Sequence, residues 1–228
     1  IANQIASALE YLHEGDIIYR DLKPDNIGLK NLLGGRYIVQ LFDFGLCREI
    51  PESSPMEDKV FHMSGVGTRR YMSPEVFLGR HYNLKADVYS WAVVFHSMIT
   101  LQRPFEMHDA EMHKLLVCQE GVRPTIFKEW PWQIQQLLRQ GWAAQASERP
   151  SMKKICSITE GLLRHIERHN RDGTPRFGYS GSDTVEDRDS SPTPRASAEN
   201  TFADFIETWT QRLCSGMCFG QNLGVEET

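Results

Sequence analysis

The sequence is short of cysteine, of basic charge and of long apolar runs. Its five cysteines contain no C-x-x-C pair, which argues against a zinc site or a disulfide-rich scaffold and favours a reducing, cytoplasmic setting. The 25 Lys and Arg are outnumbered by 30 Asp and Glu, so the net charge of −5 provides no positive field for nucleic acid. The longest apolar run, residues 91–101, is about half a membrane span. We therefore expect no nucleic-acid partner and no membrane span.

Up to residue 167 the sequence contains a mixture of helical and β-like patterns. Apolar residues recur at helical spacing over 1–12, and Gly15 follows where a left-handed helix stop is expected. Two β-like runs, 26–30 and 37–42, are separated by a Gly-bearing connection suited to a hairpin. Residues 83–100 are apolar on most sides, which predicts a buried central helix. The fold is expected to be α+β and mainly α-helical, with further helices at 108–119, 131–141 and 151–167.

We expect one domain over residues 1–168, followed by a tail of different character. Residues 169–200 are rich in Gly, Pro, Ser, Thr and Asp and are predicted to form a disordered linker. Residues 201–228 carry apolar residues that could line one face of a short amphipathic helix. The chain opens on a predicted helix at Ile1 without an initial Met, so we expect it to be a fragment.

The densest chemical signal is YRDLKPDN at residues 19–26, with the tripeptide DFG after the second β-like run. Asp21, Asn26 and Asp43 flank the predicted β-ribbon, and hard cations such as Mg²⁺ prefer oxygen ligands of this kind. Lys23 adds a compact positive charge to the same strip. Together these side chains predict a phosphate and magnesium site suited to phosphoryl transfer.

In the order and content of its motifs, the chain resembles the catalytic domain of eukaryotic protein kinases over about residues 1–167. The family's catalytic loop reads His-Arg-Asp with Asn five residues beyond the Asp, and its metal motif is Asp-Phe-Gly. By this resemblance, Asp21 orients the substrate hydroxyl and accepts its proton, and Lys23 steadies the transferred phosphoryl group. Asn26 and Asp43 are implied to hold magnesium, with ATP as the phosphate donor and proteins as substrates.

Tyr19 stands where the family usually has His, a residue that packs against the Phe of the metal motif. An aromatic Tyr can pack against Phe44 in the same way, so the substitution is not taken as a sign of inactivity. Gly45 is expected to let the backbone turn sharply after the metal ligand. The sequence DLKPDN at residues 21–26 resembles serine/threonine kinases more than tyrosine kinases. The implied acceptor is the hydroxyl of Ser or Thr.

The sequence GTRRYMSPE at residues 67–75 resembles the family's segment ending in Ala-Pro-Glu, with Ser in place of Ala. By resemblance, Thr68 hydrogen-bonds the catalytic Asp and Lys, and Glu75 is the buried partner of Arg149. Asp87 is implied to brace the catalytic loop from the central helix. The Trp-containing stretch before Arg149 is similar to that of the tyrosine-kinase-like group, which we therefore expect.

Residues 46–72 lack periodicity and are predicted to form a long loop, which the resemblance identifies as an activation segment. Our hypothesis is that Ser64 is a phosphorylation switch whose phosphate pairs with Arg20. This implies an upstream activating kinase as a further partner.

The family's N-terminal lobe has no counterpart in the sequence, which contains neither Gly-x-Gly-x-x-Gly nor a Val-Ala-x-Lys strand before the catalytic loop. We therefore interpret the chain as a C-terminal lobe with a small β-ribbon at the catalytic loop, and expect it to be inactive alone. Two alternatives stay open. One is a pseudokinase used as a binding scaffold, and the other is a phosphotransferase acting on small molecules.

Overall fold

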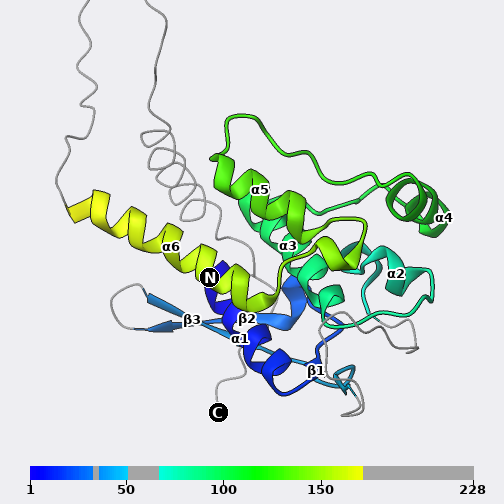
Figure 1. The fold of residues 1–228 in the computed structure, drawn as a ribbon, viewed down its shortest axis with the longest axis horizontal. Helices are drawn as coiled ribbons and strands as arrows, with labels where there is room; N and C mark the ends of the chain where they lie inside the picture. The colour runs from blue at the N-terminus through cyan, green and yellow to red at the C-terminus, as the bar shows by residue number, and fades with distance from the viewer. Residues whose placement is uncertain (33–35, 51–66, 172–228) are drawn as a thin grey trace, which may run out of the picture. The chain divides into compact units, whose positions relative to one another are not determined.

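The computed structural model describes residues 1–32, 36–50 and 67–171 of the chain (Figure 1). Contacts divide the chain into two units, one of residues 1–127 and 132–162 and the other of residues 128–131 and 163–228. The elements in chain order are α1 (Ala2–Glu14), β1 (Ile17–Ile18), η1 (Pro24–Asn26), β2 (Ile27–Leu32), β3 (Arg36–Leu41), β4 (Arg48–Glu49), η2 (Arg69–Tyr71), α2 (Pro74–Phe77), α3 (Lys85–Thr100), α4 (Ala110–Met112), the π-helix η3 (His113–Gln119), α5 (Trp132–Gly141), η4 (Ala146–Glu148) and α6 (Met152–Arg171).

Helix α1 forms where the apolar periodicity predicts a helix, and it buries Ile5 and Leu9 on one face. Its end differs in detail from the prediction. Gly15 has φ −93°, and the following Asp16 takes the left-handed conformation with φ 53°. Asp is among the residues that tolerate this conformation, so the prediction of a left-handed Gly15 is wrong by one residue.

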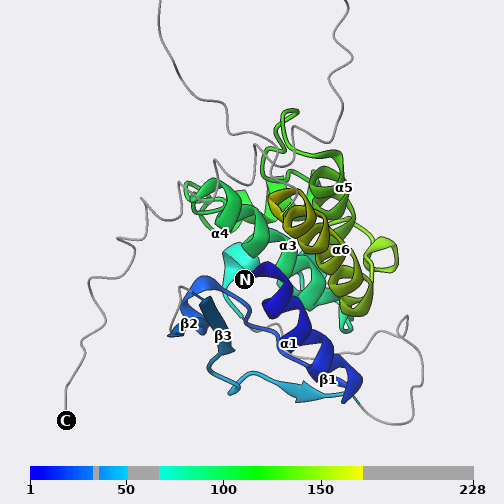
Figure 2. The ribbon, with the colours of Figure 1, turned by 90° about the vertical axis from the view of Figure 1, so that its left-hand side faces the viewer.

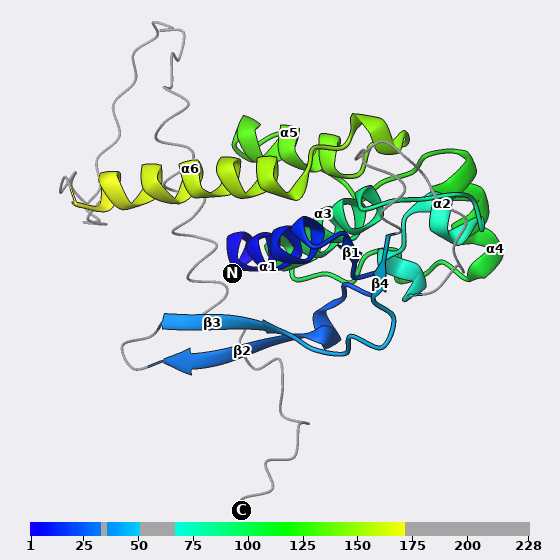
Figure 3. The ribbon, with the colours of Figure 1, turned by 60° about the horizontal axis from the view of Figure 1, so that its bottom comes forward.

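Strands β2 and β3 form the predicted antiparallel ribbon, with Ile27 opposite Leu41 and Leu32 opposite Arg36. Helix α1 holds the ribbon through the side chain of Gln4. The amide nitrogen of Gln4 donates to the Tyr37 carbonyl (3.0 Å), and its oxygen accepts from the Val39 N–H (2.8 Å). These bonds satisfy backbone groups on β3 that the ladder leaves unpaired. The ribbon consequently lies beside α1 (Figure 3).

A second, shorter ribbon pairs β1 with β4, which the sequence did not predict. Ile17 lies opposite Glu49 and Ile18 opposite Arg48, and the Ile50 N–H donates to the Asp16 carbonyl at 2.7 Å. The chain leaves β1, forms the loop before β2, returns through β3 and then enters β4. The catalytic-loop motif and the Asp-Phe-Gly motif are therefore both held between the same two ribbons.

Helix α3 is the predicted central helix, buried along most of its length from Lys85 to His96. Helix α5 lies on one side of α3 and α1 on the other (Figures 1 and 2). The α5 backbone approaches so closely that a Cβ on Gly141 would lie 2.7 Å from the Ala92 Cβ. On the α1 side, the Trp91 indole N–H donates to the Ala2 carbonyl at 3.1 Å. This close packing makes α3 rigid, so groups that bond to its side chains are held in fixed positions.

Residues 110–119 are helical as predicted, but not as one regular helix. The Asp109 side chain caps α4 by accepting from the Met112 N–H at 2.8 Å, and the chain continues as a π-helix from His113 to Gln119. Helices α5 and α6 are present where the pattern predicts them. None of the helices in the described ranges is both long and apolar enough to cross a membrane.

Candidate active site

Asp21 is a buried carboxylate, 6% exposed, that accepts hydrogen bonds from three residues. One oxygen accepts from the Lys23 ammonium (2.7 Å) and the Asn26 amide (3.2 Å). The other accepts from both the backbone N–H and the hydroxyl of Thr68, each at 2.8 Å. We call these three residues the Asp21 cradle. Because buried polar groups are costly unless they are hydrogen-bonded, the cradle supports this buried carboxylate and fixes it in one orientation.

The cradle draws on two distant parts of the sequence. Lys23 and Asn26 come from the turn that leads into β2, and the Asn26 amide also donates to the Asp21 backbone carbonyl at 2.9 Å. Thr68 comes from the segment before η2, 47 residues along the chain from Asp21. The bond predicted for Thr68 goes to Asp21, while Lys23 occupies the opposite carboxylate oxygen.

Gly67 is the residue that allows Thr68 to approach. It has φ 120°, a conformation that L side chains rarely adopt, and a Cβ there would lie 2.5 Å from the Arg20 carbonyl oxygen. Any larger residue would push the segment away from the catalytic loop. The sequence reading included Gly67 in its motif without identifying this close approach.

Tyr19 links the catalytic loop to the Asp-Phe-Gly motif. Its ring packs edge-on against Phe44 at 5.6 Å between centroids, as the substitution for His implies. Its hydroxyl donates to the Phe42 carbonyl, and burial raises the pKa of that hydroxyl so that it remains a neutral donor. The Phe42 N–H in turn donates to the Asn26 carbonyl at 2.9 Å. Tyr19 thus fixes the residue that immediately precedes Asp43.

Asp43 lies just past the end of β3 and is exposed, with its backbone in the left-handed region at φ 54°. One carboxylate oxygen accepts from the Gly45 N–H at 3.2 Å. Gly45 lies in a turn that the Cys47 N–H closes by donating to the Phe44 carbonyl at 3.0 Å. The predicted turn after the metal ligand is present, but its left-handed residue is Asp43 and not Gly45.

The donors available for a metal fit Mg²⁺. The amide nitrogen of Asn26 is occupied by Asp21, which leaves its carbonyl oxygen as the ligand-type atom, and Asp43 offers an exposed carboxylate. Within residues 1–32, 36–50 and 67–171, no group of three or more His, Cys, Asp or Glu could hold a metal unaided. Mg²⁺ is typically bound by one or two protein oxygens together with phosphate and water. Two oxygen donors from the protein are therefore enough for a magnesium site.

Asp87 on α3 braces the catalytic loop. Its two oxygens accept the backbone N–H groups of Tyr19 (2.8 Å) and Arg20 (2.9 Å). Arg20 has φ 72°, a strained conformation for a side chain of its size, and the two bonds hold it there. His13 of α1, which the sequence reading did not select, bonds the same carboxylate at 2.9 Å between Nε2 and Oδ2. The rigid α3 therefore sets the position of the residue next to Asp21.

Glu75 and Arg149 form the implied buried pair. The guanidinium reaches both Glu75 oxygens and also donates to the Lys85 carbonyl at 3.0 Å. Lys85, buried at 7% exposure, returns a bond from its ammonium to the Arg149 carbonyl at 2.9 Å. Burial alone would raise the pKa of the Glu75 carboxyl, but the hydrogen bonds and charge of Arg149 lower it overall. These residues touch none of the cradle, so their part is to support the fold.

Of the two residues in the regulatory hypothesis, only Arg20 lies within the described part of the chain. The Arg20 guanidinium donates to the Leu46 carbonyl (2.5 Å) and to the Tyr82 hydroxyl (3.2 Å), which places it beside the chain that leads into the long loop. Ser64 lies outside the described residues, as do residues 172–228 of the predicted linker and tail.

Comparison with known proteins agrees with this geometry. The family described as "Protein kinase domain" matches residues 1–159. The chain is 31% identical over 179 residues to serine/threonine-protein kinase STY17 of Arabidopsis thaliana, covering 78% of this chain and 30% of that protein. It is 32% identical over 168 residues to human mitogen-activated protein kinase kinase kinase 7, covering 72% of this chain and 26% of that protein.

A third relative is a probable LIM domain-containing serine/threonine-protein kinase of Dictyostelium discoideum. It is 34% identical over 167 residues, covering 73% of this chain and 16% of that protein. The chain thus spans less than a third of the length of each relative. With the motifs, their geometry and these matches together, the chain belongs to the eukaryotic protein kinase superfamily, as a member similar to the tyrosine-kinase-like group.

Proposed function

We propose that this chain is the C-terminal lobe of a kinase that transfers the γ-phosphate of ATP to serine or threonine hydroxyls of proteins. The observation that carries the proposal is the Asp21 cradle. A buried and oriented carboxylate next to a lysine is the arrangement expected of a group that accepts a hydroxyl proton during phosphoryl transfer.

Each residue of the site has a part in this proposal. Asp21 orients the acceptor hydroxyl and takes its proton, while Thr68 and Asn26 hold the carboxylate in place. Lys23 places its ammonium 2.7 Å from that carboxylate, where it can stabilise negative charge on the phosphoryl group during its transfer. Mg²⁺, held by Asn26 and Asp43, would supply charge neutralisation for the ATP phosphates.

We also propose that the activity of this chain depends on a second lobe. Phe42 and Phe44 beside Asp43 are each 51% exposed, an unusual state for aromatic side chains flanking a metal ligand. We infer that a second lobe covers this surface in the full-length protein and clamps the nucleotide. Without that clamp, the phosphates lose most of their positioning, so the chain alone should transfer no measurable phosphate.

The test is phosphate transfer from labelled ATP to a mixture of protein substrates, followed by identification of the labelled amino acids. The full-length protein should label Ser and Thr, the chain alone should label nothing, and full-length Asp21→Asn should lose the activity. Labelling confined to Tyr would contradict the acceptor assignment. A full-length protein that folds and transfers nothing to any substrate would support the scaffold alternative.

A further inference from the structure

Two arginines follow directly after the residue that holds Asp21. Thr68 bonds the carboxylate at 2.8 Å, and the short helix η2 begins with Arg69 and Arg70. Because consecutive Cα atoms are about 3.8 Å apart, both arginines start within about 8 Å of Thr68. We call Arg69 and Arg70 the arginine pair. A peptide that presents its hydroxyl to Asp21 must run close to it.

Neither arginine of the pair is in an ion pair within the described part of the chain. The Arg69 guanidinium donates to the His108 carbonyl (3.0 Å) and that of Arg70 to the Glu106 carbonyl (3.3 Å). Both acceptors are neutral backbone groups. The Nε of Arg69 is buried and has no hydrogen-bond acceptor there. Guanidinium groups whose only acceptors are neutral carbonyls favour an anionic partner.

Arg103 adds a third positive charge near the arginine pair. It is exposed, and both it and Arg70 act electrostatically on the hydroxyl of the buried Tyr71. Burial and the charge of Asp25 raise the pKa of Tyr71, while the two arginines oppose that rise. The charges of Arg70 and Arg103 thus act on the Tyr71 hydroxyl together with the opposite charge of Asp25.

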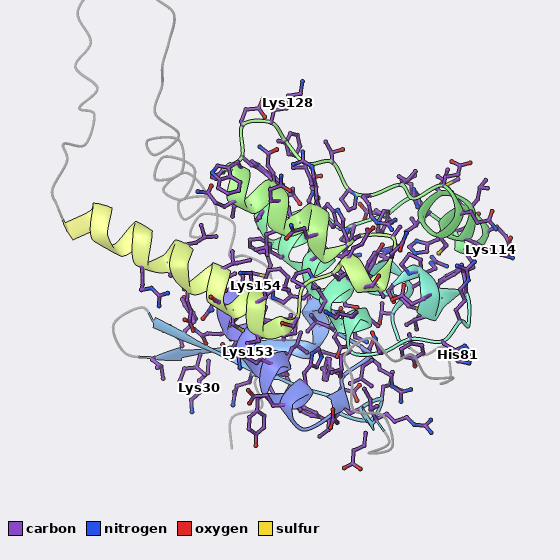
Figure 4. The ribbon with its side chains drawn as sticks, in the orientation of Figure 1. Lys30, His81, Lys114, Lys128, Lys153 and Lys154 are labelled. Carbon is purple, nitrogen blue, oxygen red and sulfur yellow. The ribbon has the colours of Figure 1, made fainter. Side chains whose placement is uncertain are left out.

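This basic character is local. The chain as a whole carries a net charge of −5. Exposed lysines elsewhere come from separate elements, such as Lys30 on β2, Lys114 on the π-helix and Lys153 on α6 (Figure 4). The arginine pair, by contrast, directly follows Thr68, whose N–H and hydroxyl donate to Asp21.

We propose that the arginine pair is a specificity site that binds an anionic side chain of the substrate within two residues of the accepted hydroxyl. The chemistry is that of a carboxylate or a phosphate, since the planar fork of arginine binds both in a bidentate manner. This inference rests on the proposed kinase function and names its substrate class: acidic or previously phosphorylated segments.

The test uses the full-length protein and a set of peptides built on one neutral parent with a single Ser. In separate peptides, each of the two positions on either side of the Ser carries Asp, phosphoserine or Lys. At one or more positions, Asp and phosphoserine should raise kcat/KM by about two- to fivefold, the size expected of an exposed ion pair, mainly through KM. The larger of the two increases identifies carboxylate or phosphate as the preferred anion.

Variants then locate the effect. Arg70→Gln should bring the ratio of kcat/KM for acidic over neutral peptide close to one, and Arg70→Glu should shift the preference to the Lys peptides. Arg69→Gln should reduce the ratio in the same direction. The matched control is Lys153→Gln, which removes an exposed charge on α6 and should leave the ratio as in the wild type.

The outcomes separate this inference from the function on which it depends. Equal kcat/KM for acidic, neutral and basic peptides in the wild type would overturn the specificity site and leave the kinase function standing. No transfer to any peptide, or to intact proteins, would overturn the kinase function itself. The comparison of peptides on the wild-type protein needs no substitution. It therefore decides the proposal even if a variant fails to fold.

Discussion

The chemistry of the site depends on a few side chains whose positions are fixed by backbone groups. Asp21 faces four donor atoms from three residues, and one of those residues can approach only because Gly67 precedes it. Motif letters alone identified Asp21, Lys23 and Thr68. The close approach of Gly67 to the Arg20 carbonyl is a three-dimensional fact that spacing in the sequence cannot reveal.

Gly67→Ala should therefore impair catalysis more than folding. The new Cβ would meet the Arg20 carbonyl at 2.5 Å in a backbone conformation already unfavourable for Ala, at a cost of about 1–3 kcal/mol. The segment should shift and take Thr68 away from Asp21, lowering kcat of the full-length protein. Gly79→Ala is the control, because Gly79 also has positive φ (63°) but no atom within 4 Å of its Cβ position. Equal loss of kcat in both variants would contradict this explanation.

His113 is a second residue whose environment has a measurable consequence. It is 1% exposed in the π-helix, packs against Phe77 and Phe105, and has no partner for either ring nitrogen among the described residues. Burial lowers the pKa of His113 to about 4, with smaller contributions from the charges of neighbouring His108, Arg69 and Arg123. The folded protein thus holds this imidazole neutral where the unfolded chain would protonate it.

Because the unfolded chain binds the proton first, His113 should cost stability as the pH falls from about 6.5 towards 4. His113→Phe should remove this loss, so its free energy of unfolding should exceed that of the wild type by an increasing margin. The margin should reach roughly 3 kcal/mol near pH 4, measured by urea unfolding over that pH range. His81→Gln, at an exposed histidine, is the control (Figure 4). A difference that does not change with pH would contradict the buried neutral state.

At the scale of secondary-structure elements, long periodic segments were predictable and short pairings were not. The β2–β3 ribbon and helices α3, α5 and α6 follow from hydrophobic period and turn residues in the sequence. The β1–β4 ribbon has only two residues in each strand, too few for a recognisable alternation. The π-helix η3 has the composition of an ordinary helix, so the sequence pattern does not distinguish its wider turn from an α-helix.

Arg149 bonds Glu75 of α2 and the Lys85 carbonyl of α3. Among the contacts between elements, we expect this one to have the largest effect on stability when it is broken. The Arg149 side chain is fully buried, so Glu75→Ala would leave its charge without a carboxylate partner. This should lower the free energy of unfolding by about 3–5 kcal/mol in urea. Glu75→Gln should cost less, since an amide oxygen still accepts one bond. The exposed Glu120→Ala, as control, should change stability by less than about 0.5 kcal/mol.

The same pair also has a defined pH dependence. The pKa of Glu75 is lowered in the folded state, so the stability it contributes is present above the ordinary carboxyl pKa and is lost as the pH falls through the lowered value. A loss of the difference between wild type and Glu75→Ala in acid is the expected result. A difference that persists unchanged at low pH would show that the pair acts through shape and not through charge.

At the scale of the whole molecule, the features of the site point in two directions. The aromatics beside Asp43 are exposed, and we propose that a nucleotide-clamping lobe covers them. The arginine pair beside Thr68 is the surface that we propose for the substrate. The net charge of −5 averages over the whole chain and so does not reveal the two arginines that directly follow Thr68.

The measurement that tests the central claim most directly is the single-turnover rate of phosphate transfer by the full-length protein at saturating ATP. It should be compared in the wild type, Asp21→Asn and Asp25→Asn, since Asp25 is an exposed carboxylate in the same loop. If Asp21 accepts the hydroxyl proton, Asp21→Asn should slow transfer by about 10²–10⁴-fold at an unchanged unfolding midpoint, while Asp25→Asn stays near the wild-type rate. A loss of less than about tenfold in Asp21→Asn, or equal losses in the two variants, would contradict the account.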